Sequence, residues 1–351
     1  MSSSPSPSLW AVILAGGVGS RFWPVSRPDR PKQLLPLASE RPLLRDAVLR
    51  LAGLVPPERL RVITGPSLVE PILAAVPELA RDQLWVEPRA AGTAPALLWA
   101  AAEIARCDPG AVFASFHADH AIHPAETMRA QVRRAAELAV RHRRLFTLGA
   151  PPTRPETGYG YIRLGPQLDG EEDAYTVERF VEKPDRVTAE AFLREGNVLW
   201  NTGLFVWRVE DLLDEAERHA PELPIAALRA GDVAGFFATA PTMAIDHAVL
   251  ERSTRVAVLR SRFAWDDVGA WDALYRTRPP DTDGNVTVGQ ACAVDCRGTA
   301  LYAEEGRLVA FGLDNVIAVR ARDLTLVLAR ERAADLKALL AKLPPEWRPE
   351  R

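Results

Sequence analysis

The sequence is poor in cysteine, has no long apolar run and carries no excess of one charge. Its 351 residues include three cysteines, and such an odd, sparse set is typical of reduced thiols rather than of a disulfide framework. Cys292 and Cys296 are spaced CxxxC, which is not a standard zinc spacing. The net charge of −3 is spread along the chain, which argues against the basic patch of a nucleic-acid or membrane-surface protein.

A membrane span is also missing from the sequence. No apolar run approaches the roughly 20 residues that cross a bilayer. The first eight residues, MSSSPSPS, have neither the positive region nor the apolar core of a signal peptide. We therefore expect residues 1–8 to be a disordered tail and the protein to be cytoplasmic.

The first 150 residues alternate short buried-looking runs with amphipathic stretches. The 48% hydrophobic content of the chain is enough for one large core and a second, small one. This alternation predicts an α/β fold with a mainly parallel sheet and helices on both faces, and ligands at the carboxyl ends of the strands. We expect strands at 11–15, 60–64, 83–87, 111–116 and 145–150, and helices at 42–54, 94–106 and 125–143.

The pattern changes after residue 155. Strands and helices mix up to about residue 275, and RPPDTDGN at 278–285 is the best linker in the sequence. Beyond it, short β runs could form a few coils of a β-helix, and a final helix is expected at 332–343. We therefore predict a larger domain at 9–280 and a small β-rich domain at 285–351.

The loop after the first strand is the richest in chemistry. Gly16, Gly17 and Gly19 are followed by Arg21 and Lys32. The pattern is neither GxGxxG, because a phenylalanine occupies the third glycine position, nor a P-loop, because no lysine precedes Lys32. Glycine amides, a guanidinium fork and a compact ammonium suit a polyphosphate. The glycines alone would equally fit a tight turn with surface cations.

The complete segment from residue 14 to residue 35 favours a functional loop over a simple turn. LAGGVGSRFWPVSRPDRPKQLL, residues 14–35, resembles the signature of the nucleotidyltransferases that make nucleoside-diphosphate sugars. RFWPVSR and PKQLL most resemble mannose-1-phosphate guanylyltransferases (GDP-mannose pyrophosphorylases). The motifs TGYGYI, FVEKP, WNTGLFVW, IDHAVLE and WDDVGAW follow in the order of that family. The resemblance implies a Rossmann-like nucleotide-diphospho-sugar transferase fold.

Four positions depart from the family pattern. Ala91 and Gly92 replace the Arg and Asn of the usual EPxxRNTAPA segment. His117 replaces the proline of PADH, and His247 stands where tyrosine is usual. The first two departures put the strictness of base recognition in doubt.

The resemblance implies transfer of GMP from GTP to α-D-mannose 1-phosphate, giving GDP-mannose and diphosphate with the help of Mg²⁺. A phosphate monoester is already a nucleophile, so no Ser, Cys or His has to be activated. The enzyme only has to position two anions and neutralise charge. Two alternatives stay open: a sibling enzyme using another base or sugar such as glucose 1-phosphate, and a non-catalytic nucleotide-sugar-binding regulatory protein. The charges retained at five positions disfavour the latter: Arg21, Lys32, Asp119, Lys183 and Asp267.

The same resemblance assigns the substrate sites. Glu87 is the candidate for reading guanine, because a carboxylate accepts N1–H and the 2-amino group together. The expected nucleotide-binding residues are Leu14, Ala15, Gly16, Gly17, Gly19, Arg21, Lys32, Glu87, Gly92 and Thr93. The expected sugar-phosphate-binding residues are Gly158, Gly160, Glu182, Lys183, Asn201 and Thr202. Strand-end charges and turn caps are the ordinary structural explanations for the polar residues among them.

The expected Mg²⁺ ligands are Asp119 and Asp267, and Asp266 is the alternative to Asp267. The histidines at 117, 120 and 123 could form a zinc cluster, but a segment that leaves a strand does not assure the shared face that a helix would give. We expect small-molecule substrates, no nucleic acid and no membrane as partners. The sequence is compatible with a homodimer and does not decide it.

Overall fold

The computed structural model describes residues 7–17 and 19–348. Residues 1–6 of the expected tail lie outside the described residues. Ser8 already belongs to the folded part, because its carbonyl accepts the Val112 N–H at 2.8 Å and its hydroxyl hydrogen-bonds Asp108. No helix in the described part of the chain is long and apolar enough to cross a membrane.

The core of the fold is a nine-stranded sheet in the order β3-β2-β1-β4-β9-β6-β10-β8-β7. The pairs β3–β2, β2–β1, β1–β4 and β6–β10 are parallel, whereas β9 runs antiparallel between β4 and β6. The predicted mixed, mainly parallel sheet is therefore confirmed. Its strands are β1 Leu9–Leu14, β2 Leu60–Thr64, β3 Leu84–Val86, β4 Val112–His117, β6 Leu145–Ala150, β7 Tyr161–Gln167, β8 Ala174–Val181, β9 Val198–Arg208 and β10 Val256–Arg260.

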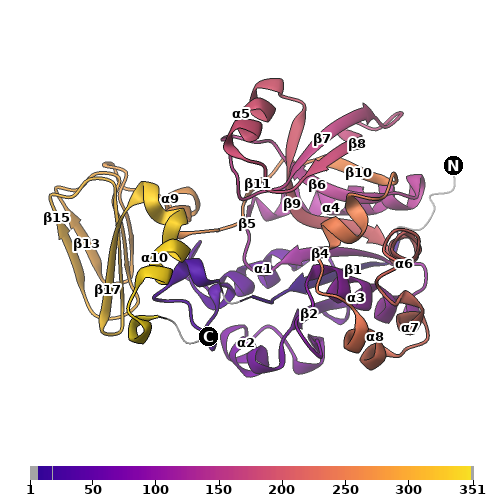
Figure 1. Cartoon of the computed structure of the whole chain (residues 1–351), viewed down its shortest axis with the longest axis horizontal. Coiled ribbons are helices and arrows are strands. Elements are labelled where there is room, and N and C mark those ends of the chain that lie inside the picture. Colours follow the sequence, from indigo (N-terminus) through magenta and orange to yellow (C-terminus); the bar gives the residue numbers. More distant parts are fainter. Residues whose placement is uncertain (1–6, 18, 349–351) are drawn as a thin grey trace.

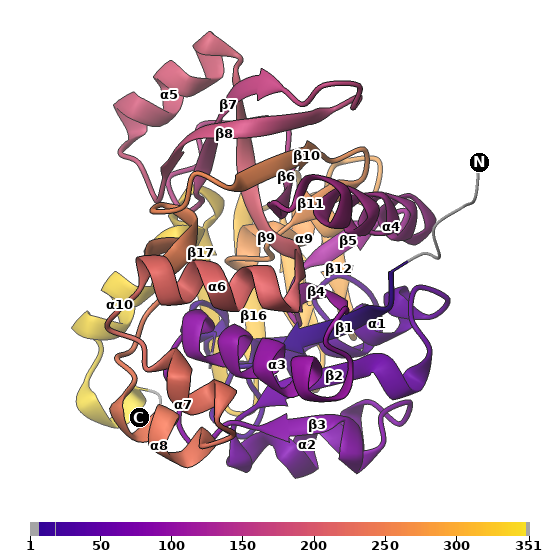
Figure 2. The same cartoon turned by 90° about the vertical axis from the view of Figure 1, so that its right-hand side faces the viewer.

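Helices cover both faces of this sheet (Figures 1 and 2). Alternate residues of a strand point to opposite faces, and β1 shows the consequence. Ala11 and Ile13 belong to one buried cluster, whereas Trp10 and Val12 belong to another. The first cluster includes residues of α1 Leu43–Leu51, α2 Val69–Ala75 and α4 Ala125–His142, and the second includes residues of α3 Thr93–Cys107, α6 Val209–His219, α7 Ile225–Arg229 and α8 Val233–Thr239.

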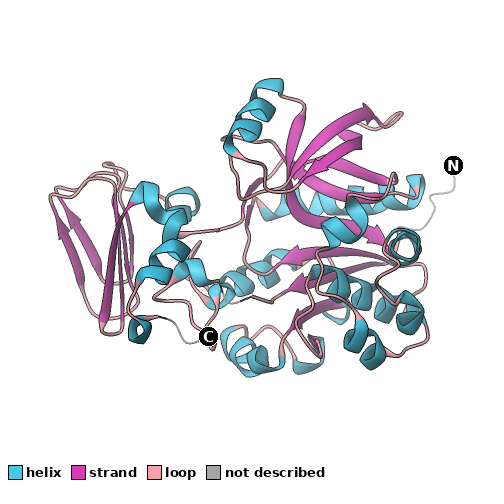
Figure 3. Cartoon of the chain, viewed as in Figure 1, coloured by secondary structure: helices cyan, strands magenta, loops and turns pink. Residues whose placement is uncertain are grey.

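The C-terminal part has the predicted β-helix-like arrangement (Figure 3). The parallel strands β12 Val286–Val288, β14 Ala300–Ala303 and β16 Val316–Ala321 form one sheet, which β17 Leu324–Ala329 closes in the antiparallel sense. Strands β13 Ala291–Val294 and β15 Leu308–Phe311 form a second parallel sheet. The chain thus passes from one sheet to the other in successive coils. The final helix begins as a 3₁₀ segment at Arg330–Asp335 and continues as α10 Leu336–Lys342.

The loop after β1 packs against this C-terminal part. Phe22, Trp23 and Val25 share a buried cluster with Val286 and Tyr302. The Trp271 indole N–H also donates to the Trp23 carbonyl at 3.1 Å. One hydrophobic core therefore crosses the predicted boundary at 280–285, and the division into two domains stays a prediction.

Candidate active site

Two short strands bring distant parts of the chain together at the carboxyl end of β4. Strand β5 Ala121–His123 pairs antiparallel with β11 Ala264–Asp266, with Asp266 opposite Ala121. Asp119 lies in the turn before β5, and Asp267 directly follows β11. Two carboxylates that are far apart in sequence therefore meet at one edge of the sheet, where parallel α/β folds bind their ligands.

Lys32 links these two segments to the loop after β1. Its Nζ donates to Asp119 Oδ2 at 2.9 Å and to the Asp267 carbonyl at 2.6 Å. Gly19, with φ +68°, makes this possible, because a Cβ added there would lie 2.3 Å from the Lys32 Cβ. The glycine loop thus packs on Lys32, and Lys32 in turn contacts both aspartates.

The pKa values of Asp119 and Asp267 are shifted in opposite directions. Burial alone would raise the pKa of Asp119, but the charges of Lys32 and of two neighbouring histidines hold it well below its usual range. Burial raises the pKa of Asp267, although Lys32 and a hydrogen bond from Tyr159 oppose the effect. The Tyr159 hydroxyl donates to Asp267 Oδ1 at 2.6 Å, and burial together with the charge of Asp267 keeps the pKa of Tyr159 raised.

Asp266 has a different environment from its neighbour. Its carboxylate accepts the Val268 N–H at 2.8 Å and the guanidinium of Arg276. Val268 is buried and has φ +48°, a strained conformation for a β-branched residue that often marks a functional site. The chain bends here. Asp266 therefore forms an ion pair with Arg276, whereas Asp267 lines a cavity.

This cavity of about 270 Å³ gathers the residues that the sequence assigned to the sugar phosphate. All six of them line it: Gly158, Gly160, Glu182, Lys183, Asn201 and Thr202. Asp267 and Asp246 also line it, as does Thr93 from the N-terminus of α3. The cavity therefore reaches the predicted metal ligand from the sugar side.

Asn201 and Thr202 differ in what they offer to this cavity. The Asn201 amide donates to Asp246 Oδ1 at 2.7 Å. The Thr202 hydroxyl donates to the Leu148 carbonyl at 2.6 Å and accepts the Leu204 N–H at 3.2 Å. Asn201 is thus oriented by a carboxylate, whereas the hydroxyl of Thr202 holds its own strand in place.

Lys183 reaches the cavity from the turn after β8. It has φ +46°, and its N–H donates to the Tyr159 carbonyl at 3.2 Å. Its Nζ donates to Glu182 Oε1 at 2.8 Å, and the side chain is 62% exposed. The backbone of Lys183 is therefore fixed, and its ammonium group is exposed to solvent beside Glu182.

Of the predicted nucleotide-binding residues, Glu87 and Gly16 lie close together beside the end of β1. Glu87 is buried, and its Oε1 lies 4.0 Å from where a Cβ on Gly16 would be. Burial raises the pKa of Glu87, partly offset by Arg89. Arg21 makes no hydrogen bond or ion pair with the other residues that the structure describes. Glu87 and Arg21 do not line the 270 Å³ cavity.

The turn that departs from the family pattern is tied to a distant loop. A Cβ on Gly92, which has φ +85°, would lie 2.5 Å from the Met243 carbonyl oxygen. The Thr93 hydroxyl accepts the Ile245 N–H at 2.9 Å. Gly92 and Thr93, which are predicted to bind the nucleotide, therefore contact the segment that carries Asp246.

The histidines do not form the three-membered cluster considered from the sequence. His117, Asp119 and His120 have ligand atoms within 4.8 Å of one another, and His123 is not in that group. The Trp265 indole N–H donates to His120 Nδ1 at 3.2 Å, so a neutral His120 carries its proton on Nε2. Burial lowers the pKa of both histidines.

Tyr159 and Asp246 are site residues to which the sequence assigned no role. Both lie inside quoted motifs, TGYGYI and IDHAVLE, so the signal was present. Their contacts depend on Asp267 and Asn201, which are far away along the chain. Only the folded arrangement shows that these two side chains complete the cavity.

Asp246 gives a prediction about stability. Burial and the charge of Glu182 raise its pKa from 3.8 to about 6. A carboxyl with a raised folded-state pKa destabilises the fold above pH 6, and this effect disappears as the pH falls towards 3.8. The difference corresponds to about 3 kcal/mol.

We therefore expect Asp246→Asn to increase the free energy of unfolding at pH 8 by up to about 3 kcal/mol, because the amide oxygen can still accept from Asn201. At pH 4.5 the gain should be much smaller. Urea denaturation at both pH values measures this, with Asp323→Asn on the surface as the control. An equal effect at both pH values would contradict the assigned cause.

Comparisons with known proteins identify the family of the chain. A family model described as "Nucleotidyl transferase" matches residues 10–284. A mannose-1-phosphate guanylyltransferase of Klebsiella pneumoniae is 34% identical over 97% of this chain and 75% of that protein. The xanthan biosynthesis protein XanB of Xanthomonas campestris is 35% identical over 97% of this chain and 74% of that protein.

A solved structure is similar over nearly the same length. It is that of a Thermus thermophilus protein described as a "mannose-1-phosphate geranyltransferase". The TM-score is 0.87 and the identity 35%, and the match covers 95% of this chain and 99% of that one. Both parts of the chain, the sheet and the C-terminal coils, are therefore shared with that protein.

Proposed function

The chain belongs to the nucleotidyl transferase family, among relatives called mannose-1-phosphate guanylyltransferases, and we propose that it transfers GMP from GTP to α-D-mannose 1-phosphate. Diphosphate and GDP-mannose are the products. The observation that carries the proposal is the position of Lys32, which joins the glycine loop to both aspartate segments. A cation at this point serves a reaction in which two anionic substrates must approach each other.

The residues of this chain divide the work. Arg21, Lys32 and the amides of the glycine loop bind the phosphates of GTP, whereas Lys183 neutralises the sugar phosphate. Glu182 and Asn201 bind the ring hydroxyls, and Thr202 keeps that strand in position. A phosphate oxygen of the sugar phosphate then attacks the α-phosphorus of GTP in line, and diphosphate leaves from the opposite side.

The carboxylates of Asp119 and Asp267 fit a divalent cation, for which we propose Mg²⁺. Each has one oxygen engaged by a donor, from Lys32 or Tyr159, and the other oxygen accepts no hydrogen bond recorded within residues 7–17 and 19–348. Mg²⁺ is usually held by one or two carboxylates together with substrate phosphates and water. When bound, it would offset the charge that develops on the phosphates.

The proposed activity is tested by diphosphate release. The purified protein should release diphosphate fastest with GTP and mannose 1-phosphate, compared with every other pairing of nucleoside triphosphate and sugar phosphate. Faster release with another pair, such as one containing glucose 1-phosphate, would assign the chain to a sibling activity. Binding of substrates without release by any pair would indicate a regulatory protein.

We expect Glu87 to select guanine. Replacing Glu87 by Gln removes the charge and one of the two acceptor oxygens and should reduce the preference for GTP over ATP about 10- to 100-fold, in line with the loss of a charged hydrogen bond. The ratio of kcat/KM for the two nucleotides measures this, with Glu58→Gln in an exposed 3₁₀ turn as the control. An unchanged ratio in Glu87→Gln would remove Glu87 from that role.

We expect Lys183 to act on the sugar phosphate alone. Lys183→Ala should raise the KM for mannose 1-phosphate by about tenfold or more, as the loss of a charged contact would, and leave the KM for GTP nearly unchanged. The matched control is Lys337→Ala on α10, which lies outside the cavity. An equal increase of both KM values would place Lys183 elsewhere in the mechanism.

A further inference from the structure

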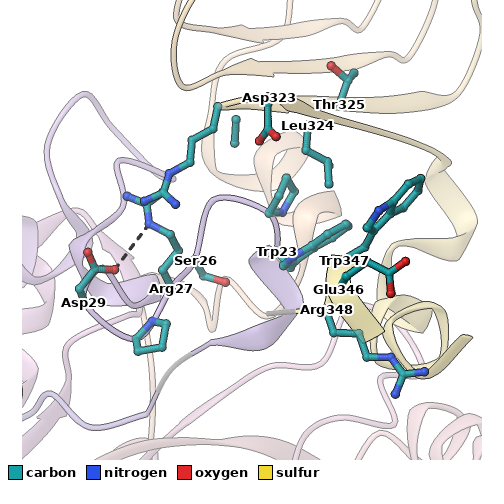
Figure 4. A pocket seen from close by; sticks show the side chains of 14 residues that line it. Trp23, Ser26, Arg27, Asp29, Asp323, Leu324, Thr325, Glu346, Trp347 and Arg348 are labelled. Atoms are coloured by element: carbon teal, nitrogen blue, oxygen red, sulfur yellow. Dashed lines mark ion pairs between the residues drawn. The ribbon is translucent and has the colours of Figure 1, made fainter. Parts of the chain in front are cut away.

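A second, larger cavity of about 850 Å³ lies between the loop after β1 and the C-terminal part (Figure 4). Its walls come from residues 23–29, from the β16–β17 turn at 321–325 and from residues 346–348. It shares no residue with the 270 Å³ cavity of the active site. Its volume is in the range of small-molecule sites, and the proposed reaction leaves it without a role.

One end of this cavity is aromatic. Trp23 and Trp347 both line it, and Figure 4 shows the two indoles near each other. Trp23 is 8% exposed and its backbone carbonyl accepts the Trp271 indole N–H, whereas Trp347 is 60% exposed. An exposed indole beside a fixed one offers a stacking surface for a planar ring, and such stacking tolerates any base.

The other groups in the cavity include donors without partners. Ser26 is 3% exposed, and its hydroxyl finds no hydrogen-bond partner in the described part of the chain. The buried Nε of Arg27 donates no hydrogen bond there either: it lies 3.5 Å from Asp29 Oδ1 without hydrogen-bonding it, while the Nη1 of the same guanidinium contacts Glu304 Oε1 at 3.4 Å. Arg322, at the tip of the β16–β17 turn, makes no ion pair with any residue between 7 and 348 that the structure describes. Such donors suit an anionic group, because guanidinium forks bind phosphate oxygens well.

Carboxylates are the third kind of group in this cavity. Asp29, Asp323 and Glu346 line the same cavity, and a carboxylate accepts hydrogen bonds from ribose hydroxyls or from the N–H groups of a base. Indoles, guanidinium groups and carboxylates in one cavity match a molecule that has a planar ring, hydroxyls and an anionic tail. A nucleoside diphosphate has all three features.

We propose that this cavity is a second binding site, separate from the active site, for a nucleoside diphosphate, free or esterified to a sugar. The choice of ligand rests on the proposed function, because GDP-mannose carries this group. The same loop that lines the cavity through Trp23 and Arg27 also bears Arg21 and Lys32. The loop therefore connects this cavity to the residues proposed to bind the phosphates of GTP.

The site is tested by counting bound GDP. Isothermal titration of the whole chain should give two GDP per chain, and Arg322→Ala and Trp347→Ala should each weaken one of the two sites by about tenfold or more. Arg307→Ala and Phe311→Ala are matched controls on the same C-terminal part, outside the cavity, and should titrate like wild type. Lys32→Ala should weaken only the other site. Hydrogen exchange should report protection at 321–325 when GDP is present.

Parallel titrations with GDP-mannose, GTP, ADP and inorganic diphosphate define the ligand. GDP or GDP-mannose binding at the second site supports the proposal, and the tighter of the two identifies the source of the diphosphate group. Binding of inorganic diphosphate alone would overturn it, as would one GDP per wild-type chain or unchanged titrations in both variants. Failure of the diphosphate-release assay, with two GDP sites still present, would instead count against the proposed reaction only.

Discussion

Lys32→Ala is expected to lower kcat by about 10²- to 10³-fold, as the removal of one preorganised electrostatic stabiliser of a transition state does. The ammonium contacts Asp119 Oδ2 and the Asp267 carbonyl, and Gly19 packs directly on its stem. Alanine deletes the charge that we propose binds the phosphates of GTP, and it also releases the loop from both aspartate segments. The effect should therefore appear in kcat as well as in the KM for GTP.

The structural cost of this substitution has to be separated from the catalytic one. Asp119 would lose the cation that holds its pKa low, and removing one partner of this partly buried ion pair is destabilising. Lys32→Arg keeps the charge but changes its shape and should keep the fold while recovering only part of the rate. Lys342→Ala at the end of α10 is the control for loss of a lysine. Near-normal turnover in a folded Lys32→Ala variant would refute the phosphate cradle.

The sheet could be predicted from the sequence because its strands are buried on both faces. Such strands read as continuous apolar runs, and helices with an apolar stripe alternate with them. The antiparallel insertion of β9 between β4 and β6 could not be predicted, since periodicity carries no information on strand direction. The β-helix-like arrangement was predictable because its short strands and turns recur along 285–329.

The cavity illustrates where sequence reasoning ends. The family motifs indicated Glu182, Lys183 and Asp267, and the structure brings the six residues predicted for the sugar phosphate together. The motifs did not indicate that the Thr202 hydroxyl is hydrogen-bonded to backbone groups. In the sequence, a threonine that binds a sugar hydroxyl cannot be distinguished from one that holds its own strand. The function of Asp246 and Tyr159 was missed for a related reason, namely that their partners lie 45 and 108 residues away.

The packing of the opening loop on the C-terminal part was also outside the reach of the sequence. Phe22 and Val25 look like ordinary core residues, and nothing local indicates that their neighbours are Val286 and Tyr302. The loop therefore has two surfaces, one towards the aspartates and one towards the coils. Its position between them makes the C-terminal part relevant to the active site.

The second large effect is expected at the aspartates. Asp119→Asn and Asp267→Asn preserve the shape of the side chain and delete one charge each. Both carboxylates are the proposed ligands of the metal ion, and each has one oxygen held by a neutral or cationic donor. Turnover should fall by about 10²-fold or more in each variant, while GTP still binds weakly through the glycine loop.

Asp266→Asn separates a metal ligand from a structural neighbour. Its carboxylate is committed to Arg276 and the Val268 N–H, so this variant should lose stability and keep the Mg²⁺ dependence of the wild type. The Mg²⁺ concentration giving half-maximal turnover should rise in Asp119→Asn and Asp267→Asn but not in Asp266→Asn. Direct titration with Mn²⁺, followed by electron paramagnetic resonance, gives a readout that does not depend on turnover. If Asp119→Asn or Asp267→Asn binds the ion and turns over like the wild type, that aspartate is not a ligand.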